Sequence, residues 1–281
     1  MATRAAADIL ARVRIGPDTR VLITGASRGI GRATAEAFAA RRSTVGLVAR
    51  SADQIEELAA ELRSRGATAE ALPADVGERD QVERTVEQFV QRAGAIDVLV
   101  ANAGVAWHGP FRQLPSEQID RMTRINWLGT AYTVSAALPH MLDRAAGRVV
   151  VVSSVAALRT FPWAAVYGAT KAAQRGFLEA LHHELSGTGV GVTGVYPGEI
   201  ATHLHDDNRA HGRLPDWYRE GAAIPPETVA HAILRAVEEE RRAVYVPPST
   251  RLLRIVHGVS PSLADRMLRV MLGRTAAPAS D

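Results

Sequence analysis

The chain has 281 residues, of which 47% are hydrophobic and 22% are charged, and this composition is typical of a folded globular protein. It contains no cysteine, which excludes disulfides, thiolate metal sites and cysteine nucleophiles. The formal net charge is only +3 and the basic residues are spread along the chain, so the charge indicates no nucleic-acid partner.

The N-terminal segment 1–19 has no continuous apolar stretch of the kind found in a secretory signal. No run in the chain approaches the roughly 18 apolar residues of a membrane span. We expect residues 1–19 to form a short helical extension before the first strand. Together with the absence of cysteine, these features favour a cytoplasmic location.

Short runs rich in β-branched residues alternate with amphipathic stretches along almost the whole chain, which is typical of βαβ units and of a parallel sheet covered on both faces. No linker or repeat separates a second domain, so we expect one domain at 20–248 and a tail at 249–281. The expected strands are 20–24, 44–49, 68–72, 96–101, 148–153, 191–196 and 243–246. The expected helices include 30–41, 52–65, 79–93 and 116–144.

The first expected strand runs directly into the glycine-rich sequence TGASRGIG and then into an alanine-rich helical pattern. Gly25 permits a tight turn, Gly29 lets the backbone approach a pyrophosphate, and Gly31 allows close packing of helix on strand. The N-terminus of the following helix offers free N–H groups to a phosphate. This context favours a dinucleotide-binding loop over a glycine turn without a ligand.

The second expected strand ends in Ala49-Arg50-Ser51. An acidic residue near this point usually holds a free ribose 2′-hydroxyl, and none is present. Arg50, aided by Arg28 in the glycine loop, could instead bind a 2′-phosphate. The alternative is that both are solvated surface arginines. The pattern predicts NADP(H) rather than NAD(H).

Tyr167 and Lys171 are four residues apart, so a helix would place both side chains on one face. An ammonium beside a phenol lowers the pKa of the phenol from about 10, making it a usable acid or base. An exposed helical pair is the alternative interpretation. Of the 33 lysines and arginines, however, Lys171 is the only lysine, and an arginine differs from it in shape and protonation. Ser154 lies thirteen residues before Tyr167, where its hydroxyl could bind a substrate carbonyl.

With these motifs the chain resembles the short-chain dehydrogenase/reductase family, roughly from Val21 to Val246. TGASRGIG is similar to the family's TGxxxGxG loop, and Tyr167 with Lys171 to its YxxxK motif. Further matches are Asp75-Val76 at the adenine contact, Ala101-Asn102-Ala103-Gly104 for NNAG, Asn126 for the helix asparagine that holds a relay water, and Pro197-Gly198-Glu199-Ile200-Ala201-Thr202 for PGxxxT.

The resemblance implies a single-domain Rossmann fold with a doubly wound parallel sheet of about seven strands, helices on both faces and a C-terminal amphipathic helical tail. It implies interconversion of a ketone or aldehyde with an alcohol by hydride transfer, no metal, and a homodimer or homotetramer. The catalytic residues would be Asn126, Ser154, Tyr167 and Lys171. The cofactor-binding residues would be Gly25, Ser27, Arg28, Gly29, Ile30, Gly31, Arg50, Ser51, Asp75, Val76, Asn102, Ala103, Gly104, Tyr167, Lys171, Pro197, Gly198, Ile200 and Thr202.

The departures from the family pattern are few. Ala101 replaces the first asparagine of NNAG, which would loosen a strand-stabilising hydrogen bond. Thr170 stands where serine is common and keeps the hydroxyl. Ser153 and Ser154 are adjacent, and Ser154 has the family's spacing to Tyr167.

The segment 203–224 lies where the family places its variable substrate loop. Its histidines, His203, His205 and His211, suggest either a metal site or a polar lid, and their irregular spacing favours the lid. Trp217 and Tyr218 could close over an apolar substrate or simply anchor the loop.

The tail segment 251–274 has many apolar residues interleaved with five arginines, and Pro261 divides it into two short amphipathic helices. Three interpretations are open: packing on its own domain or on a second subunit, a flap over a lipophilic pocket, and binding to an anionic membrane surface. The alternatives for function are a membrane-peripheral reductase of a lipophilic substrate and a non-catalytic NADP(H)-sensing protein. Retention of Tyr167 and Lys171 argues against the latter.

Overall fold

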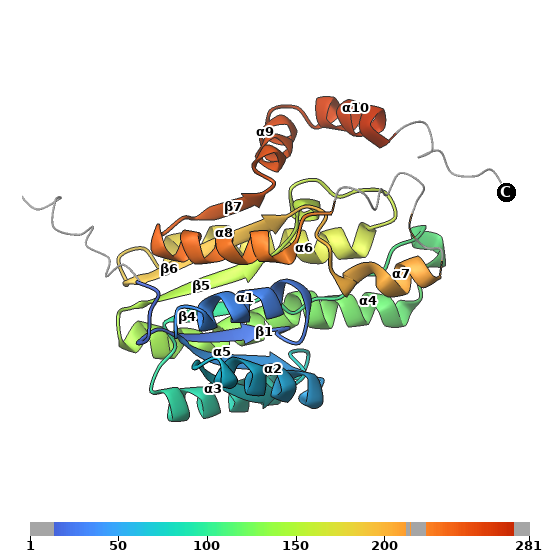
Figure 1. Ribbon diagram of the computed structural model, residues 1–281. Coiled ribbons are helices and arrows are strands. Elements are labelled where there is room, and N and C mark those ends of the chain that lie inside the picture. Colours follow the sequence, from blue (N-terminus) through green and yellow to red (C-terminus); the bar gives the residue numbers. More distant parts are fainter. Residues whose placement is uncertain (1–13, 212–213, 215–222, 273–281) are drawn as a thin grey trace, which may run out of the picture.

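The computed structural model describes residues 14–211, 214 and 223–272. Within these residues seven strands form one parallel sheet, in the order β3-β2-β1-β4-β5-β6-β7, as shown in Figure 1. The predicted doubly wound sheet of about seven strands is therefore confirmed. The strands are β1 (Arg20–Thr24), β2 (Thr44–Ala49), β3 (Thr68–Pro73), β4 (Val98–Ala101), β5 (Gly147–Val152), β6 (Val190–Pro197) and β7 (Ala243–Val246).

Helices cover both faces of the sheet (Figure 1). On one face α1, α2 and α8 pack onto the strands through a core that includes Phe38 and Ile233. On the other face α3, α5 and α6 do the same through a core that includes Phe89 and Leu178. Strands buried on both faces must be apolar throughout, as β5 is. The helices are α1 (Gly29–Ala39), α2 (Ala52–Ser64), α3 (Arg79–Ala93), α5 (Gly129–Asp143), α6 (Ala165–Glu184) and α8 (Pro226–Glu238).

Strand β4 begins two residues later than the sequence pattern predicted. The reason is Asp97, whose carboxylate accepts hydrogen bonds from the Arg20 backbone N–H at 2.8 Å and from Arg20 Nε at 2.7 Å. Arg144 Nη2 donates to the same carboxylate at 2.8 Å. Asp97 thus joins the amino ends of β1 and β4 to the end of α5. The candidate site lies at the opposite, carboxyl ends of the strands.

The segment 116–144, predicted as one helix, consists of α4 (Ser116–Met122), a π-helical turn η2 (Thr123–Leu128) and α5. Asn126 lies in the π turn and is fully buried. Its side-chain oxygen accepts from the Val105 N–H at 2.8 Å, and its amide donates to the Val105 carbonyl at 2.9 Å. Single π turns of this kind are frequent at functional sites.

Shorter elements connect these layers: η1 (Phe111–Gln113), η3 (Val155–Ala157), η4 (His203–His205), α7 (Asp206–Ala210) and η6 (Pro248–Thr250). The expected N-terminal helix falls mainly on residues 1–13, which lie outside the described residues, whereas residues 14–19 form a turn that leads into β1. In the described part of the chain, no helix has the length and apolar character needed to cross a membrane.

The tail forms the two helices expected on either side of Pro261, α9 (Arg251–Val259) and α10 (Pro261–Leu272). Figure 1 shows them beyond the β7 edge of the sheet. Arg254 Nη1 donates to the Tyr245 hydroxyl at 3.0 Å, and Arg159 contacts Asp265. Among the tail side chains that the structure describes, Leu252, Ile255, Val259, Leu263 and Val270 are apolar and exposed.

Candidate active site

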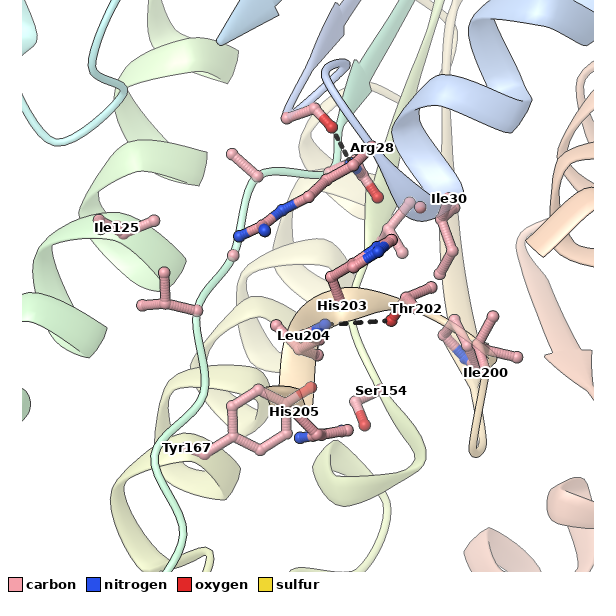
Figure 2. A pocket seen from close by; sticks show the side chains of 18 of the residues that line it. Arg28, Ile30, Ile125, Ser154, Tyr167, Ile200, Thr202, His203, Leu204 and His205 are labelled. Atoms are coloured by element: carbon pink, nitrogen blue, oxygen red, sulfur yellow. Dashed lines mark hydrogen bonds between the residues drawn. The ribbon is translucent and has the colours of Figure 1, made fainter. Parts of the chain in front are cut away.

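A cavity of about 770 Å³ lies at the carboxyl ends of the strands. Strands β2 and β3 extend the sheet from one side of β1, whereas β4 to β7 extend it from the other, and ligands bind at such switch points in open α/β sheets. Every residue predicted to bind cofactor or to act in catalysis lines this cavity, except Gly31 and Asn126. Figure 2 shows Arg28 from the glycine loop at one end of the cavity and Ser154 and Tyr167 at the other.

The glycine loop needs glycine at three positions for steric reasons. Gly25 has a φ of +67°, and a Cβ there would lie 2.8 Å from the Ala103 Cα. Gly29 has a φ of +57°. Gly31 lies outside the cavity lining, and its Cβ would come within 2.1 Å of the Gly25 carbonyl oxygen. The backbone therefore closes tightly around the start of α1, whose free N–H groups suit the diphosphate of a dinucleotide.

The loop is fastened to β4 by Asn102. Its side-chain amide donates to the carbonyls of Thr24 at 3.0 Å and of Gly25 at 3.2 Å. The Thr24 hydroxyl in turn accepts from the backbone N–H groups of Asn102 and Ala103. Ala101 is buried and apolar in β4, and Asn102 makes its own bonds to the glycine loop.

Arg50 follows β2 at the rim of the cavity, where its side chain is 56% exposed. Its nearest anion is the Asp75 carboxylate, 3.9 Å away, and an exposed pair of this length contributes little stability. Asp75 also accepts from the Gly77 N–H at 2.9 Å. Arg28 extends over the cavity from the glycine loop (Figure 2). Both arginines are placed where a phosphate could bind them.

Tyr167 and Lys171 project from α6 into the far end of the cavity and are buried. Lys171 Nζ donates to the Val152 carbonyl at 3.0 Å and lies 5.9 Å from the Tyr167 ring centre. Ser154, at the end of β5, also lines the cavity. The Ser153 hydroxyl instead donates to the Lys171 carbonyl at 3.0 Å and thereby helps fix α6 to β5.

Burial raises the pKa of the Tyr167 phenol above its ordinary value of 10.0, and a hydrogen bond with Ser154 opposes that rise. Burial also lowers the pKa of the Lys171 ammonium to about 7. Both shifts have the same cause, because a low-dielectric environment disfavours any charged form. The direction for Tyr167 is opposite to the one that the Tyr–Lys spacing predicted, because burial is the largest influence on the pKa of the phenol.

Asn126 does not line the cavity, and protein groups use the polar atoms of its side chain. Besides its bonds to Val105, its amide donates to the Thr170 hydroxyl at 3.1 Å. Its backbone carbonyl accepts from Gln174 Nε2 at 2.7 Å and from the Thr130 hydroxyl at 2.8 Å. Asn126 therefore ties the loop after β4 to α6, and the water relay expected from the resemblance stays a prediction.

The segment after β6 closes the cavity from the β7 side. The Gly198 N–H donates to the Val246 carbonyl at 2.7 Å, and Ile200 bridges to Ile224 at the base of the expected substrate loop. Thr202 caps η4 by accepting from the Leu204 N–H (Figure 2). In that loop His203 and His205 line the cavity, while Trp217 and Tyr218 lie outside the described residues. Among the residues described, no His, Cys, Asp or Glu cluster is placed to hold a metal ion.

Sequence reasoning missed His108, which lies in the loop after β4 and lines the cavity. Its ring centre is 6.0 Å from that of Tyr167 and 4.9 Å from that of His205. No motif marks His108, because only the fold brings it beside Tyr167. Phe161 is a second lining residue that the sequence did not single out.

A doubly wound sheet with a glycine loop and a cavity at its switch point defines a nucleotide-binding α/β protein. A family model described as short chain dehydrogenase matches residues 19–212. The ketoacyl reductase HetN of Nostoc is 32% identical over 256 residues, which cover 89% of this chain and 88% of that protein. Uncharacterized oxidoreductase YxnA of Bacillus subtilis is 33% identical over 261 residues, covering 91% and 72%.

Two solved structures are also similar to this chain in fold and sequence. A 3-ketoacyl-ACP reductase from Sinorhizobium meliloti has a TM-score of 0.73 and 35% identity, covering 80% of this chain and 96% of that chain. An alcohol dehydrogenase from Thermococcus sibiricus, complexed with 5-hydroxy-NADP, has a TM-score of 0.71 and 29% identity, covering 81% and 94%. The chain belongs to the short-chain dehydrogenase family of oxidoreductases.

Proposed function

We propose that this protein is an NADP(H)-dependent oxidoreductase that interconverts a ketone or aldehyde with the corresponding alcohol, with Tyr167 as the acid–base residue. The observation that carries the proposal is the meeting of Tyr167, Ser154 and Lys171 in one cavity with the glycine loop. The two ends of that cavity suit the two partners of a hydride transfer, a dinucleotide and a small carbonyl compound.

The cofactor, when bound, supplies the hydride that reduces the carbonyl carbon. Ser154 Oγ accepts from the Ala156 N–H at 3.1 Å, and its hydroxyl, which hydrogen-bonds Tyr167, would turn to donate to the substrate's carbonyl oxygen. Tyr167 then donates its proton to that oxygen as negative charge develops there. The raised pKa keeps the phenol protonated at neutral pH, so the residue is ready to act as an acid. Reduction is therefore the direction we expect at neutral pH.

Lys171 would return a proton to the Tyr167 phenol after each reduction. Its pKa of about 7 allows the amine to gain or lose a proton near neutral pH. In the direction of oxidation Tyr167 must first lose its proton, which its raised pKa opposes. Alcohol oxidation is accordingly expected to need alkaline conditions.

The preference for NADP(H) is supported by the two arginines and by the absence of an acidic residue at the end of β2. Arg50 is exposed and only loosely paired, so it can bind a 2′-phosphate without losing a strong partner. A neighbouring structure, the Thermococcus alcohol dehydrogenase, is described as a complex with an NADP derivative. Its bound ligand supports a preference for NADP(H) in this protein as well.

The test is oxidation of NADPH and NADH by the full chain, screened over ketones, aldehydes and quinones. We expect consumption of NADPH with at least one ketone or aldehyde and weaker use of NADH. Faster consumption of NADH than of NADPH would overturn the cofactor assignment. No carbonyl-dependent consumption of either cofactor would overturn the reaction class.

A second candidate function is a membrane-peripheral reductase of a lipophilic substrate. The specific observation in its favour is the exposed apolar side chains of α9 and α10, which occur beside Arg251 and Arg269. Sedimentation with vesicles containing anionic lipid should deplete the full chain but not Ile255→Asp/Val259→Asp. Equal sedimentation of both proteins would exclude this function. Loss of a dimer or tetramer in the variant, without any vesicle binding, would assign the surface to a second subunit.

A further inference from the structure

His108 is a buried polar residue of the cavity that the proposed mechanism does not use. Only 8% of its surface is exposed. Within the described residues its Nε2 is buried and has no hydrogen-bond partner. A buried polar atom without a partner is unfavourable. His108 lines the cavity, although Nε2 itself has almost no accessible surface, so a small turn of the ring would be needed to bring this atom to a ligand.

The position of the ring fits contact with a substrate. His108 and Tyr167 both line the cavity, and their ring centres are 6.0 Å apart. A carbonyl oxygen held at the Tyr167 hydroxyl would place the neighbouring atoms of the substrate within a few ångströms of the imidazole. His108 therefore lies beside the part of the substrate that adjoins the reacting carbonyl.

The backbone around His108 is fixed without help from its side chain. Asn208, fully buried in α7, accepts from the His108 N–H at 2.9 Å and donates to the Ala106 carbonyl at 2.9 Å. The Gly109 N–H donates to the Trp163 carbonyl at 2.9 Å. Since these bonds involve only the backbone of residues 106–109, the imidazole is not needed to shape the loop.

The imidazole is uncharged at neutral pH. Burial lowers the pKa of His108 to about 4. His205, whose ring lies 4.9 Å away, has its pKa lowered to about 3 by burial, with His108 and Arg209 adding to the effect. Figure 2 shows that η4 brings His205 to the end of the cavity that holds Ser154 and Tyr167. Neutral imidazoles offer one N–H donor and one acceptor each, which suits an uncharged oxygen better than a carboxylate.

Building on the proposed function, we propose that His108 determines substrate specificity by hydrogen-bonding a second, uncharged oxygen that the substrate carries a few bonds from the reacting carbonyl. A ketone with an ester or thioester group close to it satisfies the imidazole. A simple ketone leaves Nε2 unpaired, and sites with an unpaired buried polar group discriminate strongly against such ligands.

The test compares two compounds of equal chain length, ethyl 3-oxobutanoate and 2-heptanone, in the full-length protein and in His108→Phe. The ratio of kcat/KM for the oxo ester to that for the ketone should fall about tenfold in His108→Phe, the usual effect of one lost hydrogen bond in a buried site. His108→Asn, which keeps a donor and an acceptor, should recover part of the ratio. Asn208→Ala, which loosens the loop, should lower both values without changing their ratio.

An unchanged ratio in His108→Phe would overturn the proposal. Binding of both compounds to the NADP⁺-loaded protein, measured by ligand-observed NMR, gives the same comparison without turnover. A preference for the oxo ester that His108→Phe abolishes would support the role of His108 even if neither compound were reduced, and that result would count against the proposed function alone. Equal binding of the two compounds by the wild-type protein would overturn the role of His108.

Discussion

The Lys171 Nζ atom lies 5.9 Å from the centre of the Tyr167 ring and donates its hydrogen bond to the Val152 carbonyl. The lysine is thus beside the tyrosine, but its hydrogen bond is to strand β5. Both groups are buried, which raises the pKa of the phenol and lowers that of the ammonium. The pair therefore favours a protonated tyrosine next to an amine whose pKa is about 7, as the proposed mechanism requires.

Tyr167→Phe should abolish most turnover while leaving cofactor binding intact. The change removes only the hydroxyl, and loss of a general acid costs roughly 10²–10⁴-fold in rate. We expect kcat to fall within that range, whereas the NADPH dissociation constant, measured by fluorescence titration, should change less than about threefold. Substantial retained turnover would remove Tyr167 from the mechanism.

The two adjacent serines should behave differently. Ser154→Ala removes the hydroxyl proposed to bind the substrate's carbonyl oxygen, and losing one such donor costs roughly 10²–10³-fold in kcat. Ser153→Ala instead breaks the bond to the Lys171 carbonyl, so it should lower stability by about 1 kcal/mol with a much smaller effect on rate. Steady-state kinetics and urea unfolding of both variants make the comparison. A larger kinetic defect in Ser153→Ala would reverse the assignment.

Arg50→Ala should weaken NADPH selectively. A hydrogen-bonded ion pair with the 2′-phosphate contributes about 1.5–3 kcal/mol, so KM for NADPH should rise roughly 10- to 100-fold, while KM for NADH stays nearly constant. Arg63→Ala is the matched control, because Arg63 is an exposed arginine of α2 that pairs with Glu56. Equal effects of Arg50→Ala on the two cofactors would show that Arg50 does not recognise the phosphate.

Local motifs predicted much of the fold and site. The glycine loop could be recognised from the sequence because Gly25 and Gly31 are required by close contacts. A Cβ at either position would collide with the loop itself or with the residues that follow β4. The Tyr167–Lys171 spacing determines that both side chains lie on one face of α6. The alternation of strands and helices was enough to predict the parallel sheet, since each crossover leaves the next strand parallel.

Three features depend on information that local patterns lack. The π turn around Asn126 interrupts the segment 116–144, whose pattern predicted one continuous helix. The pKa of Tyr167 depends on burial, which the spacing to Lys171 does not reveal. His108 reaches the cavity because Asn208, a hundred residues away in sequence, binds its backbone. Long-range contacts of this kind can be recognised only after folding.

The stability of the protein should fall as the pH decreases from about 6.5 to about 4. The pKa of His108 is lowered to about 4 in the folded chain, whereas an unfolded histidine titrates near 6.5. In this interval the unfolded chain binds a proton that the folded chain does not, so acid favours unfolding. Above about pH 6.5 both states leave His108 neutral and its contribution is constant.

His108→Phe should remove part of this acid sensitivity. At pH 5 the wild-type protein should have lost about 2 kcal/mol of stability through His108 alone, and the variant should lack that loss, while His205 still contributes to both. Urea unfolding at pH 7 and pH 5 measures the difference. His231→Phe, on the exposed face of α8, is the control and should retain the wild-type dependence on pH. If wild type and His108→Phe lose equal stability between pH 7 and pH 5, His108 is not held neutral in the folded protein.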